Sequence, residues 1–245
     1  MNAPSSKAPR AVLFDAYGTL FDVYSVALLA EQLYPGHGER LSVIWRDKQI
    51  EYTRLCSMSD SGGRHYRPFW DITRAALRFT AQRLGLPLAR EDEEHLMSQY
   101  RHLSAFPESR AVLAELKQRG VRAGVLSNGD PDMLAVAIRS AGFSDLLDPV
   151  LSVQPVRAFK PDPRCYALGA QALGLPARSV AFVSGNGWDA IGATWFGYTT
   201  LWVNRGGLPL EQLETEPTRI GTSLRDVLDF FDPPKDLPRK RAPVA

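Results

Sequence analysis

Four small groups of polar residues in this 245-residue sequence each come at the end of a run of apolar residues. The first is Asp15, which follows the apolar residues 11–14 and precedes a turn signal at Gly18 and Thr19. An apolar run that stops at a turn is typical of a buried strand. In an open α/β sheet, reactive groups lie just beyond the carboxyl ends of the strands. The other groups follow three later runs and supply hydroxyls, amides, an ammonium group and a second acid: Ser127 and Asn128, Lys160, and Ser184, Asn186 and Asp189.

A carboxylate, an ammonium group and several hydrogen-bonding side chains at strand ends are typical of the reactive edge of an α/β sheet. Each group also has a structural interpretation, because Ser127 can start a turn, Lys160 can be a solvated charge and Asp189 can be a helix N-terminal acid. The pattern occurs at four strand ends, and parallel strands place those ends on one side. We therefore expect the groups to meet in one crevice.

The elements that would hold these groups alternate along the second half of the chain. Strands that alternate with helices indicate βαβ units with a parallel sheet and right-handed crossovers. The sequence therefore predicts an α/β protein with a Rossmann-like, doubly wound parallel sheet. Helices are expected at 107–119, 131–142, 163–174 and up to 196, and strands at 121–126, 150–153, 180–183 and 200–203.

Residues 22–104 differ from the rest, because they contain apolar residues at helical spacing and no convincing strand. We therefore predict a helical cap of residues 22–104, inserted into an α/β core domain of residues 10–21 and 105–232. Residues 1–9 and 233–245 are expected to be flexible tails. Four helices are expected within the insert, at 25–34, 39–57, 68–84 and 91–103.

Composition and charge restrict the possible partners. The chain has a net charge of +2, and its basic C-terminal tail accounts for it, so no nucleic-acid-binding surface is indicated. Cys56 and Cys165 lack the spacing of a metal site and, as free cysteines, suit a reducing compartment. No apolar run is long enough to cross a membrane, and the N-terminus lacks the apolar segment of a signal peptide. We expect a cytoplasmic protein that binds neither nucleic acid nor membranes.

The four polar groups together resemble the four motifs of the haloacid dehalogenase superfamily, in the form Asp15-Ala-Tyr-Gly-Thr, Ser127-Asn, Lys160-Pro-Asp and Ser184-x-Asn-x-x-Asp. The finer similarity is to the L-2-haloacid dehalogenase branch of that superfamily. It is carried by residues 14–23, 45–52, 126–129 and 182–189. The resemblance spans about residues 10–232, and the helical insert corresponds to the cap of that family.

The resemblance implies that short L-2-haloalkanoic acids are hydrolysed to D-2-hydroxy acids and halide through an ester on Asp15, with inversion at C2. It implies that Arg46 of the cap stabilises the departing halide with an always-charged guanidinium. Thr19 and Ser127 would position Asp15 and the substrate carboxylate, and Lys160 would keep Asp15 ionised. The other implied site residues are those that orient or deprotonate the hydrolytic water, Ser184, Asn186 and Asp189, and those near the substrate or Lys160, Tyr17, Asn128, Tyr166 and Trp188.

Two other functions stay open: a Mg²⁺-dependent small-molecule phosphatase of the same superfamily, and a non-catalytic binding protein on this scaffold. The phosphatases have a second acid two positions after the nucleophile. This chain has Tyr17 there, and a usual tyrosine pKa of about 10 suits neither general acid nor general base catalysis at neutral pH. Asn186 beside the single Asp189 offers few of the carboxylate oxygens that Mg²⁺ prefers. We therefore expect no metal and no cofactor, and the resemblance also implies a homodimer.

Some positions depart from the pattern of the L-2-haloacid dehalogenase branch. Asp47 stands where familiar members tend to carry an amide beside the arginine, so it could weaken the anion site or point outward. Arg54 and Cys56 lie in a stretch that is more apolar in those members, and Gly185 replaces a common serine. These departures bear on substrate range and rate more than on the type of reaction.

Overall fold

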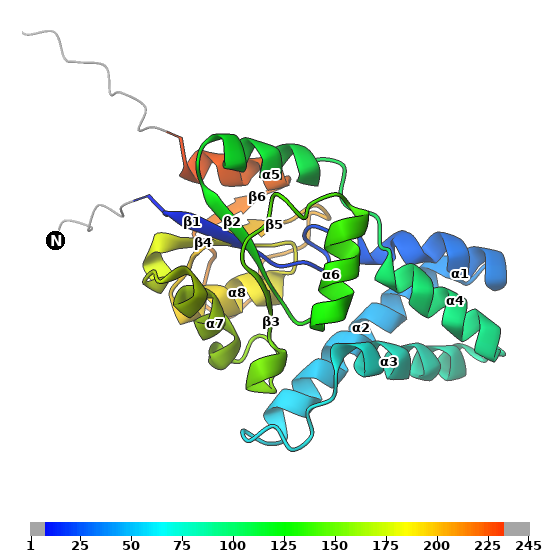
Figure 1. The fold of residues 1–245 in the computed structure, drawn as a ribbon. Helices are drawn as coiled ribbons and strands as arrows, with labels where there is room; N and C mark the ends of the chain where they lie inside the picture. Colours follow the sequence, from blue (N-terminus) through cyan, green and yellow to red (C-terminus); the bar gives the residue numbers. More distant parts are fainter. Residues whose placement is uncertain (1–7, 233–245) are drawn as a thin grey trace, which may run out of the picture.

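The computed structural model describes residues 8–232, and its centre is a single six-stranded sheet (Figure 1). The strands are β1 (Ala11–Phe14), β2 (Arg122–Ser127), β3 (Val150–Ser152), β4 (Val180–Ser184), β5 (Thr199–Val203) and β6 (Arg219–Gly221). All neighbours pair in parallel, in the order β3-β2-β1-β4-β5-β6. The direction of winding reverses between β1 and β4, which is where an open α/β sheet forms a crevice.

The predicted doubly wound parallel sheet is confirmed by this strand order. Strand β6 is not predicted from the sequence, because the three residues of this strand are mostly exposed and contain no apolar run. The flexible tails predicted for residues 1–9 and 233–245 lie outside the described residues, apart from Ala8 and Pro9.

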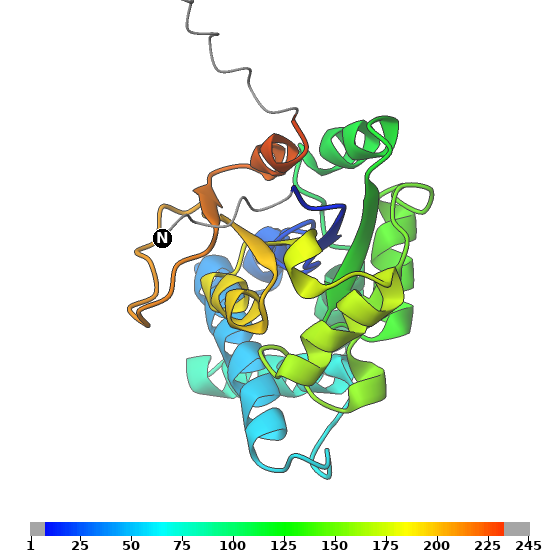
Figure 2. The ribbon, with the colours of Figure 1, turned by 90° about the vertical axis from the view of Figure 1, so that its left-hand side faces the viewer.

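Helices cover both faces of the sheet (Figures 1 and 2). On one face lie α5 (Ser109–Gln118) and the 3₁₀ helix η4 (Leu224–Phe230), and on the other lie α7 (Pro163–Leu173) and α8 (Gly187–Phe196). Because both faces are covered, every residue of β1 and β4 is buried. The remaining elements around the sheet are α6 (Pro131–Ser140), which packs beside β3, and the short 3₁₀ helices η2 (Gln154–Val156) and η3 (Ala177–Ser179).

Residues 22–104 form a group of helices, which we call the helical block, next to the carboxyl ends of the central strands (Figure 1). The block contains no strand, as the sequence predicts, and α2 and α3 pack along each other inside it. None of the helices within residues 8–232 is long and apolar enough to cross a membrane. The elements of the block are η1 (Val23–Val26), α1 (Ala27–Leu33), α2 (Gly38–Met58), α3 (Phe69–Leu84) and α4 (Arg90–Arg101).

Asp130 caps a helix other than the one that it precedes. Its backbone occupies the N-cap position of α6, but its side chain makes no capping bond there. The two carboxylate oxygens accept hydrogen bonds from the backbone N–H groups of Phe69 (2.9 Å) and Trp70 (2.8 Å), which begin α3. Burial raises the pKa of Asp130, and the two N–H donors oppose this shift. A core residue therefore fixes the start of a helix in the helical block.

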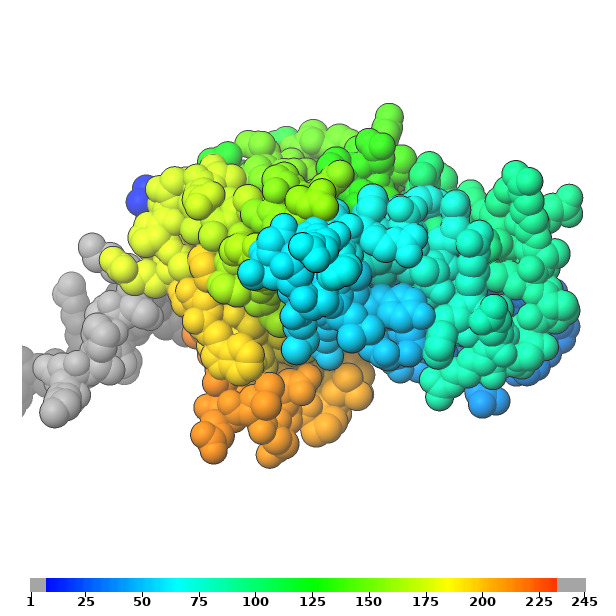
Figure 3. Space-filling model, turned by 90° about the horizontal axis from the view of Figure 1, so that it is seen from below, coloured from blue at the N-terminus to red at the C-terminus, as the bar shows by residue number. Residues whose placement is uncertain are grey.

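Three further contacts join the helical block to the core near the end of α2. The N–H of Phe159 donates to the hydroxyl of Ser57 (2.8 Å), and Arg157 donates to the carbonyl of Gly63 (3.0 Å). Arg164 donates to the carbonyl of Ser61. Figure 3 shows this part of the block (cyan) lying directly against the core segments that follow β3 (lime). The crevice at the strand ends is therefore covered.

Candidate active site

Asp15 is the first residue after β1, and both oxygens of its carboxylate are held. Its backbone N–H donates to the carbonyl of Val183 in β4 (2.9 Å), which places the residue at the point where the sheet reverses. Oδ1 accepts a hydrogen bond from Nζ of Lys160 (2.8 Å). Oδ2 accepts two, from the hydroxyl of Thr19 (2.9 Å) and from Nδ2 of Asn186 (2.9 Å). The carboxylate is therefore fixed in one orientation.

Lys160 bridges two carboxylates inside the core. Its ammonium group donates to Asp15 (2.8 Å), to Oδ2 of Asp189 (2.7 Å) and to the carbonyl of Leu126 (3.2 Å). The side chain is only 1% exposed. Burial by itself would lower the pKa of Lys160, but the charges of Asp15 and Asp189 outweigh it and raise the pKa above its usual 10.5. Lys160 is therefore a cation at neutral pH.

Asp189 lies behind Lys160 and is fully buried. Its Oδ1 accepts a hydrogen bond from the hydroxyl of Tyr166 (2.7 Å), and Oδ2 accepts one from Ser184 (3.0 Å) in addition to that of Lys160. Burial raises the pKa of Asp189, and the nearby Lys160 opposes this shift. The predicted residues Tyr166, Ser184 and Asp189 thus form a support for the lysine.

Two predicted residues, Ser127 at the end of β2 and Asn128 directly after it, are fixed by the backbone around them. The hydroxyl of Ser127 accepts a hydrogen bond from the N–H of Gly129 (3.1 Å). Oδ1 of Asn128 accepts one from the N–H of Lys160 (2.9 Å). The ends of β2 and of the segment that carries Lys160 are therefore joined directly, as the shared sheet edge predicts.

Arg46 comes from α2 of the helical block and reaches the same sheet edge. Its Nη2 donates to the carbonyl of Tyr17 (3.1 Å) and to Oδ1 of Asn186 (3.2 Å), and its Nη1 donates to Oε1 of Gln49 (2.7 Å). All three acceptors are neutral. Within residues 8–232 no carboxylate forms an ion pair with Arg46, so its positive charge is uncompensated in the sense that no anionic group is bonded to it.

Asp15 and Arg46 line a small enclosed space, which we call the inner site, of about 10 Å³. Three of its lining residues, Ile50, Thr53 and Phe69, are absent from the sequence prediction. Ile50 and Thr53 follow Arg46 by four and seven positions, so helical periodicity could have placed them on its face. Phe69 is brought in by the packing of α3 and has no local signal. The full lining consists of Asp15, Tyr17, Arg46, Ile50, Thr53, Phe69, Ser127, Asn128 and Trp188.

Comparison with known proteins gives a family for this arrangement. Residues 9–197 match the model of the haloacid dehalogenase-like hydrolases. The chain belongs to this family. It is 43% identical over 223 residues to an (S)-2-haloacid dehalogenase from Pseudomonas sp. (strain YL), covering 91% of this chain and 94% of that protein.

Solved structures of two relatives resemble this hydrolase over most of their length. One is an L-2-haloacid dehalogenase that is 56% identical, with a TM-score of 0.89, covering 91% of this chain and 98% of the other. The second is the L-2-haloacid dehalogenase of Xanthobacter autotrophicus with chloropropionic acid covalently bound. It is 36% identical, with a TM-score of 0.83 and the same coverage of both chains.

The hydrolase has a second hollow, which we call the outer cavity, of about 490 Å³ beside the inner site. Trp188 lines both, and the guanidinium of Arg54 lies 5.4 Å from the centre of its ring. The indole N–H of Trp188 is buried and has no hydrogen-bond partner within the described part of the chain. Met58 and Trp195 are exposed at the rim of the outer cavity. Trp188 therefore separates a closed space from one that opens to solvent.

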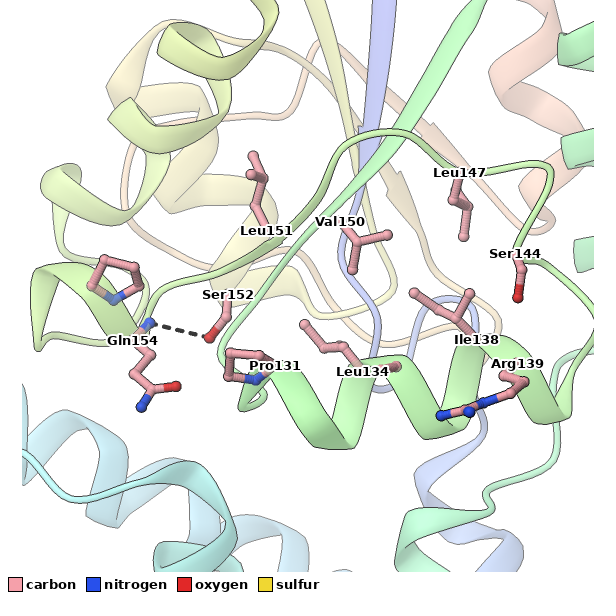
Figure 4. Close-up of a pocket in the computed structure, with 12 residues that line it drawn as sticks. Pro131, Leu134, Ile138, Arg139, Ser144, Leu147, Val150, Leu151, Ser152 and Gln154 are labelled. Atoms are coloured by element: carbon pink, nitrogen blue, oxygen red, sulfur yellow. Dashed lines mark hydrogen bonds between the residues drawn. The ribbon is translucent and has the colours of Figure 1, made fainter.

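A larger groove of about 960 Å³ lies away from these residues, between α6 and β3 (Figure 4). Its walls are mainly apolar and include Leu134, Ile138 and Val150. No residue of the predicted site lines it. The polar chemistry of this hydrolase is therefore concentrated at the inner site.

The departures from the family pattern have clear positions. Asp47 is exposed and forms no ion pair with Arg46 within residues 8–232, so it points away from the inner site. A Cβ atom at Gly185 would lie 2.1 Å from the carbonyl oxygen of Gly18, so no larger residue fits there without movement of the backbone.

The donor set around Asp15 does not fit a metal ion. In the part of the chain that the structure describes, no group of three or more His, Cys, Asp or Glu residues is placed to hold one. The position between the carboxylates of Asp15 and Asp189 is taken by the ammonium group of Lys160. Burial raises the pKa of Tyr17 well above its usual value, so this side chain stays neutral beside Asp15.

Proposed function

We propose that this hydrolase converts short L-2-haloalkanoic acids into D-2-hydroxy acids and halide, through an ester on Asp15. The observation that carries the proposal is a fixed carboxylate, Asp15, and an uncompensated cation, Arg46, on the walls of one enclosed space. The names of the relatives, which are L-2-haloacid and (S)-2-haloacid dehalogenases, support the same substrate class.

In the first step an oxygen of Asp15 attacks C2 of the substrate from the side opposite to the halogen. The carbon–halogen bond breaks, its electron pair leaves with the halide, and the configuration at C2 inverts. Oδ1 accepts one hydrogen bond and Oδ2 accepts two, so Oδ1 keeps the more available lone pair. The guanidinium of Arg46 stabilises the halide as its charge develops.

In the second step water attacks the carboxyl carbon of the Asp15 ester. The bond between that carbon and the ester oxygen, which Asp15 had supplied, breaks; the D-2-hydroxy acid leaves with this oxygen as its hydroxyl, and Asp15 keeps one oxygen from water. Over both steps one proton is released. Lys160, Thr19 and Asn186 already donate to the two oxygens of Asp15, so they are placed to stabilise the negative charge of the tetrahedral intermediate.

Asp189 has a different role in this proposal from the one that the family resemblance implies. A base for the hydrolytic water must reach that water, directly or through one other. Asp189 is fully buried, does not line the inner site and already accepts bonds from Tyr166, Ser184 and Lys160. These contacts support a positioning role, in which Asp189 holds the lysine that holds Asp15.

The substrate carboxylate is assigned to the polar wall formed by Ser127, Asn128 and the ring of Tyr17.

We further propose that the helical block, residues 22–104, is a cap that closes over the bound acid. A space of about 10 Å³ holds at most a single water molecule, so the block must shift before a substrate can enter. Closure then excludes bulk water from the ester. A cytoplasmic location stays a prediction from the free cysteines, and a homodimer stays a prediction from the resemblance.

The test is halide release from L-2-chloropropionate by the purified protein, with the D-isomer and EDTA in parallel. We expect release from the L-isomer only, undiminished by EDTA, with D-lactate as the product. A single turnover in H₂¹⁸O should give unlabelled lactate and put one ¹⁸O into Asp15. Release of phosphate from simple esters only when Mg²⁺ is added, without halide release, would establish the phosphatase alternative. No reaction with either class of substrate would favour a binding protein.

A further inference from the structure

Gln49 is a buried amide in α2 that does not line the inner site but is bonded to a residue that does. It lies three residues after Arg46 and is 1% exposed. Its Oε1 accepts hydrogen bonds from Nη1 of Arg46 (2.7 Å) and from the hydroxyl of Tyr100 (3.1 Å). Its Nε2 donates to the hydroxyl of Thr73 (2.6 Å). One neutral side chain therefore connects the cationic residue of the inner site to both α3 and α4.

The orientation of this amide is determined by its partners. A guanidinium can only donate hydrogen bonds, so the oxygen of Gln49 must face Arg46 and the nitrogen must face Thr73. Thr73 in turn donates to the carbonyl of Phe69 (2.7 Å), and its own carbonyl accepts from the indole of Trp45 (2.8 Å). The guanidinium is thus anchored through Gln49 to the same helix that places Phe69 in the inner site.

The chemical type of residue 49 also decides the charge available to a ligand. A glutamate here would reach Arg46 equally well but would form a buried ion pair with it. The other two acceptors of Arg46, the carbonyl of Tyr17 and Oδ1 of Asn186, are also neutral. In a site of low dielectric constant, a carboxylate beside the guanidinium would repel an arriving anion and cancel most of the attraction.

We propose that Gln49 is a positioning residue that fixes the guanidinium of Arg46 in the inner site while leaving its positive charge free for the departing halide. The inference rests on the proposed dehalogenation, and it explains why the anchor is an amide. Tyr100 completes the anchor by donating to the same oxygen.

The experiment compares Gln49→Glu with Gln49→Met in the full-length protein. Gln49→Met removes the anchor but leaves Arg46 unpaired, whereas Gln49→Glu keeps an acceptor and adds a charge. We expect kcat for L-2-chloropropionate to fall about tenfold in Gln49→Met and roughly 10²–10³-fold in Gln49→Glu, with KM rising much less than kcat falls, because the leaving halogen gains its full negative charge only in the transition state. Gln82→Glu, the same substitution at an exposed position of α3, is the matched control and should leave both constants unchanged.

A second measurement follows the anion itself. Inhibition by added bromide should weaken by about tenfold in Gln49→Glu, which corresponds to about 1.4 kcal/mol of lost attraction. In Gln49→Met, the loss of kcat should be greater for the chloro than for the bromo substrate, because chloride is the poorer leaving group. This second variant keeps the inference testable if Gln49→Glu does not fold.

The outcomes separate this inference from the proposed function. If the unmodified protein releases no halide, the proposed function is wrong. If it does, and Gln49→Glu is milder than Gln49→Met, Gln49 only fills and connects the helical block, and the inference is overturned. Equal losses for chloro and bromo substrates in Gln49→Met would overturn it as well.

Discussion

The two cations of the candidate active site have opposite surroundings. Lys160 belongs to the core and lies between the carboxylates of Asp15 and Asp189, so its charge is more than balanced. Arg46 belongs to the helical block and has only neutral acceptors. The core therefore holds a nucleophile in place, whereas the block presents a guanidinium to which no carboxylate is bonded within residues 8–232. The nucleophile and the anion site thus come from two regions of the fold, the α/β core and the helical block.

The largest effect is expected from the nucleophile. Asp15→Asn should lower kcat for halide release by roughly 10⁴-fold or more, because the amide is a poor nucleophile and no other carboxylate among residues 8–232 lines the inner site. The measurement is steady-state halide release, with circular dichroism to confirm folding. Asp47→Asn is the matched control, because Asp47 is exposed and forms no ion pair with Arg46 within residues 8–232, and it should retain activity within about twofold. Normal turnover in Asp15→Asn would contradict the assignment of the nucleophile.

The difference between the two cations can be tested by comparing the activity and stability of Lys160→Met with those of Arg46→Met. Both should lose about 10²–10³-fold in kcat. Lys160→Met should also lose about 3–5 kcal/mol of unfolding free energy, because it leaves two buried carboxylates unpaired. Arg46→Met leaves only neutral acceptors without a donor and should lose about 1–3 kcal/mol. Urea unfolding measures both values.

Equal destabilisation by the two substitutions would remove the distinction between a balanced and an uncompensated cation. The double variant with Lys160→Met and Asp189→Asn is the control for the core. It removes one carboxylate together with its cation, so it should recover part of the stability but none of the activity.

The raised pKa of Lys160 predicts how stability depends on pH. Two carboxylates raise this pKa against the effect of burial, so the folded protein holds the proton more tightly than the unfolded chain does. The stabilisation by this ion pair is therefore complete below pH 10.5 and is lost as the pH rises through the higher folded-state value. We expect the unfolding free energy to fall above pH 10.5 by up to about 1.4 kcal/mol per pH unit from this group. Lys160→Met should show a shallower alkaline decline, and an unchanged slope would contradict the prediction.

The smallest effect concerns the contact that aligns the two regions. Asp130→Ala should destabilise the protein by about 1 kcal/mol, because the first N–H groups of α3 lose their cap. Since Phe69 begins α3 and lines the inner site, we also expect KM to rise about threefold while kcat stays nearly constant. Asp132→Ala, an exposed acid in the first turn of α6, is the control. If both variants behave alike, Asp130 does not align the helical block.

The sequence by itself determined where the core residues lie. Asp15, Ser127 and Ser184 could be located because each ends or follows a buried apolar run, and Lys160 because it follows the loop after a predicted strand; the rule that parallel strands share one edge then brings them together. The helical nature of residues 22–104 was also predictable, because helical spacing is a local pattern. The three-residue strand β6 was not, because an exposed edge strand leaves no apolar run.

Only the tertiary structure decided how the helical block meets the core. The bonds of Gln49 to α3 and α4, the position of Phe69 and the cap that Asp130 gives to α3 all join segments that are distant in the sequence. Such contacts depend on how helices pack and on which polar partner a buried group finds, and neither is encoded in local spacing. The sequence thus located the nucleophile and its lysine, and the packing of α2 and α3 decided which charge faces them and how closely the site is enclosed.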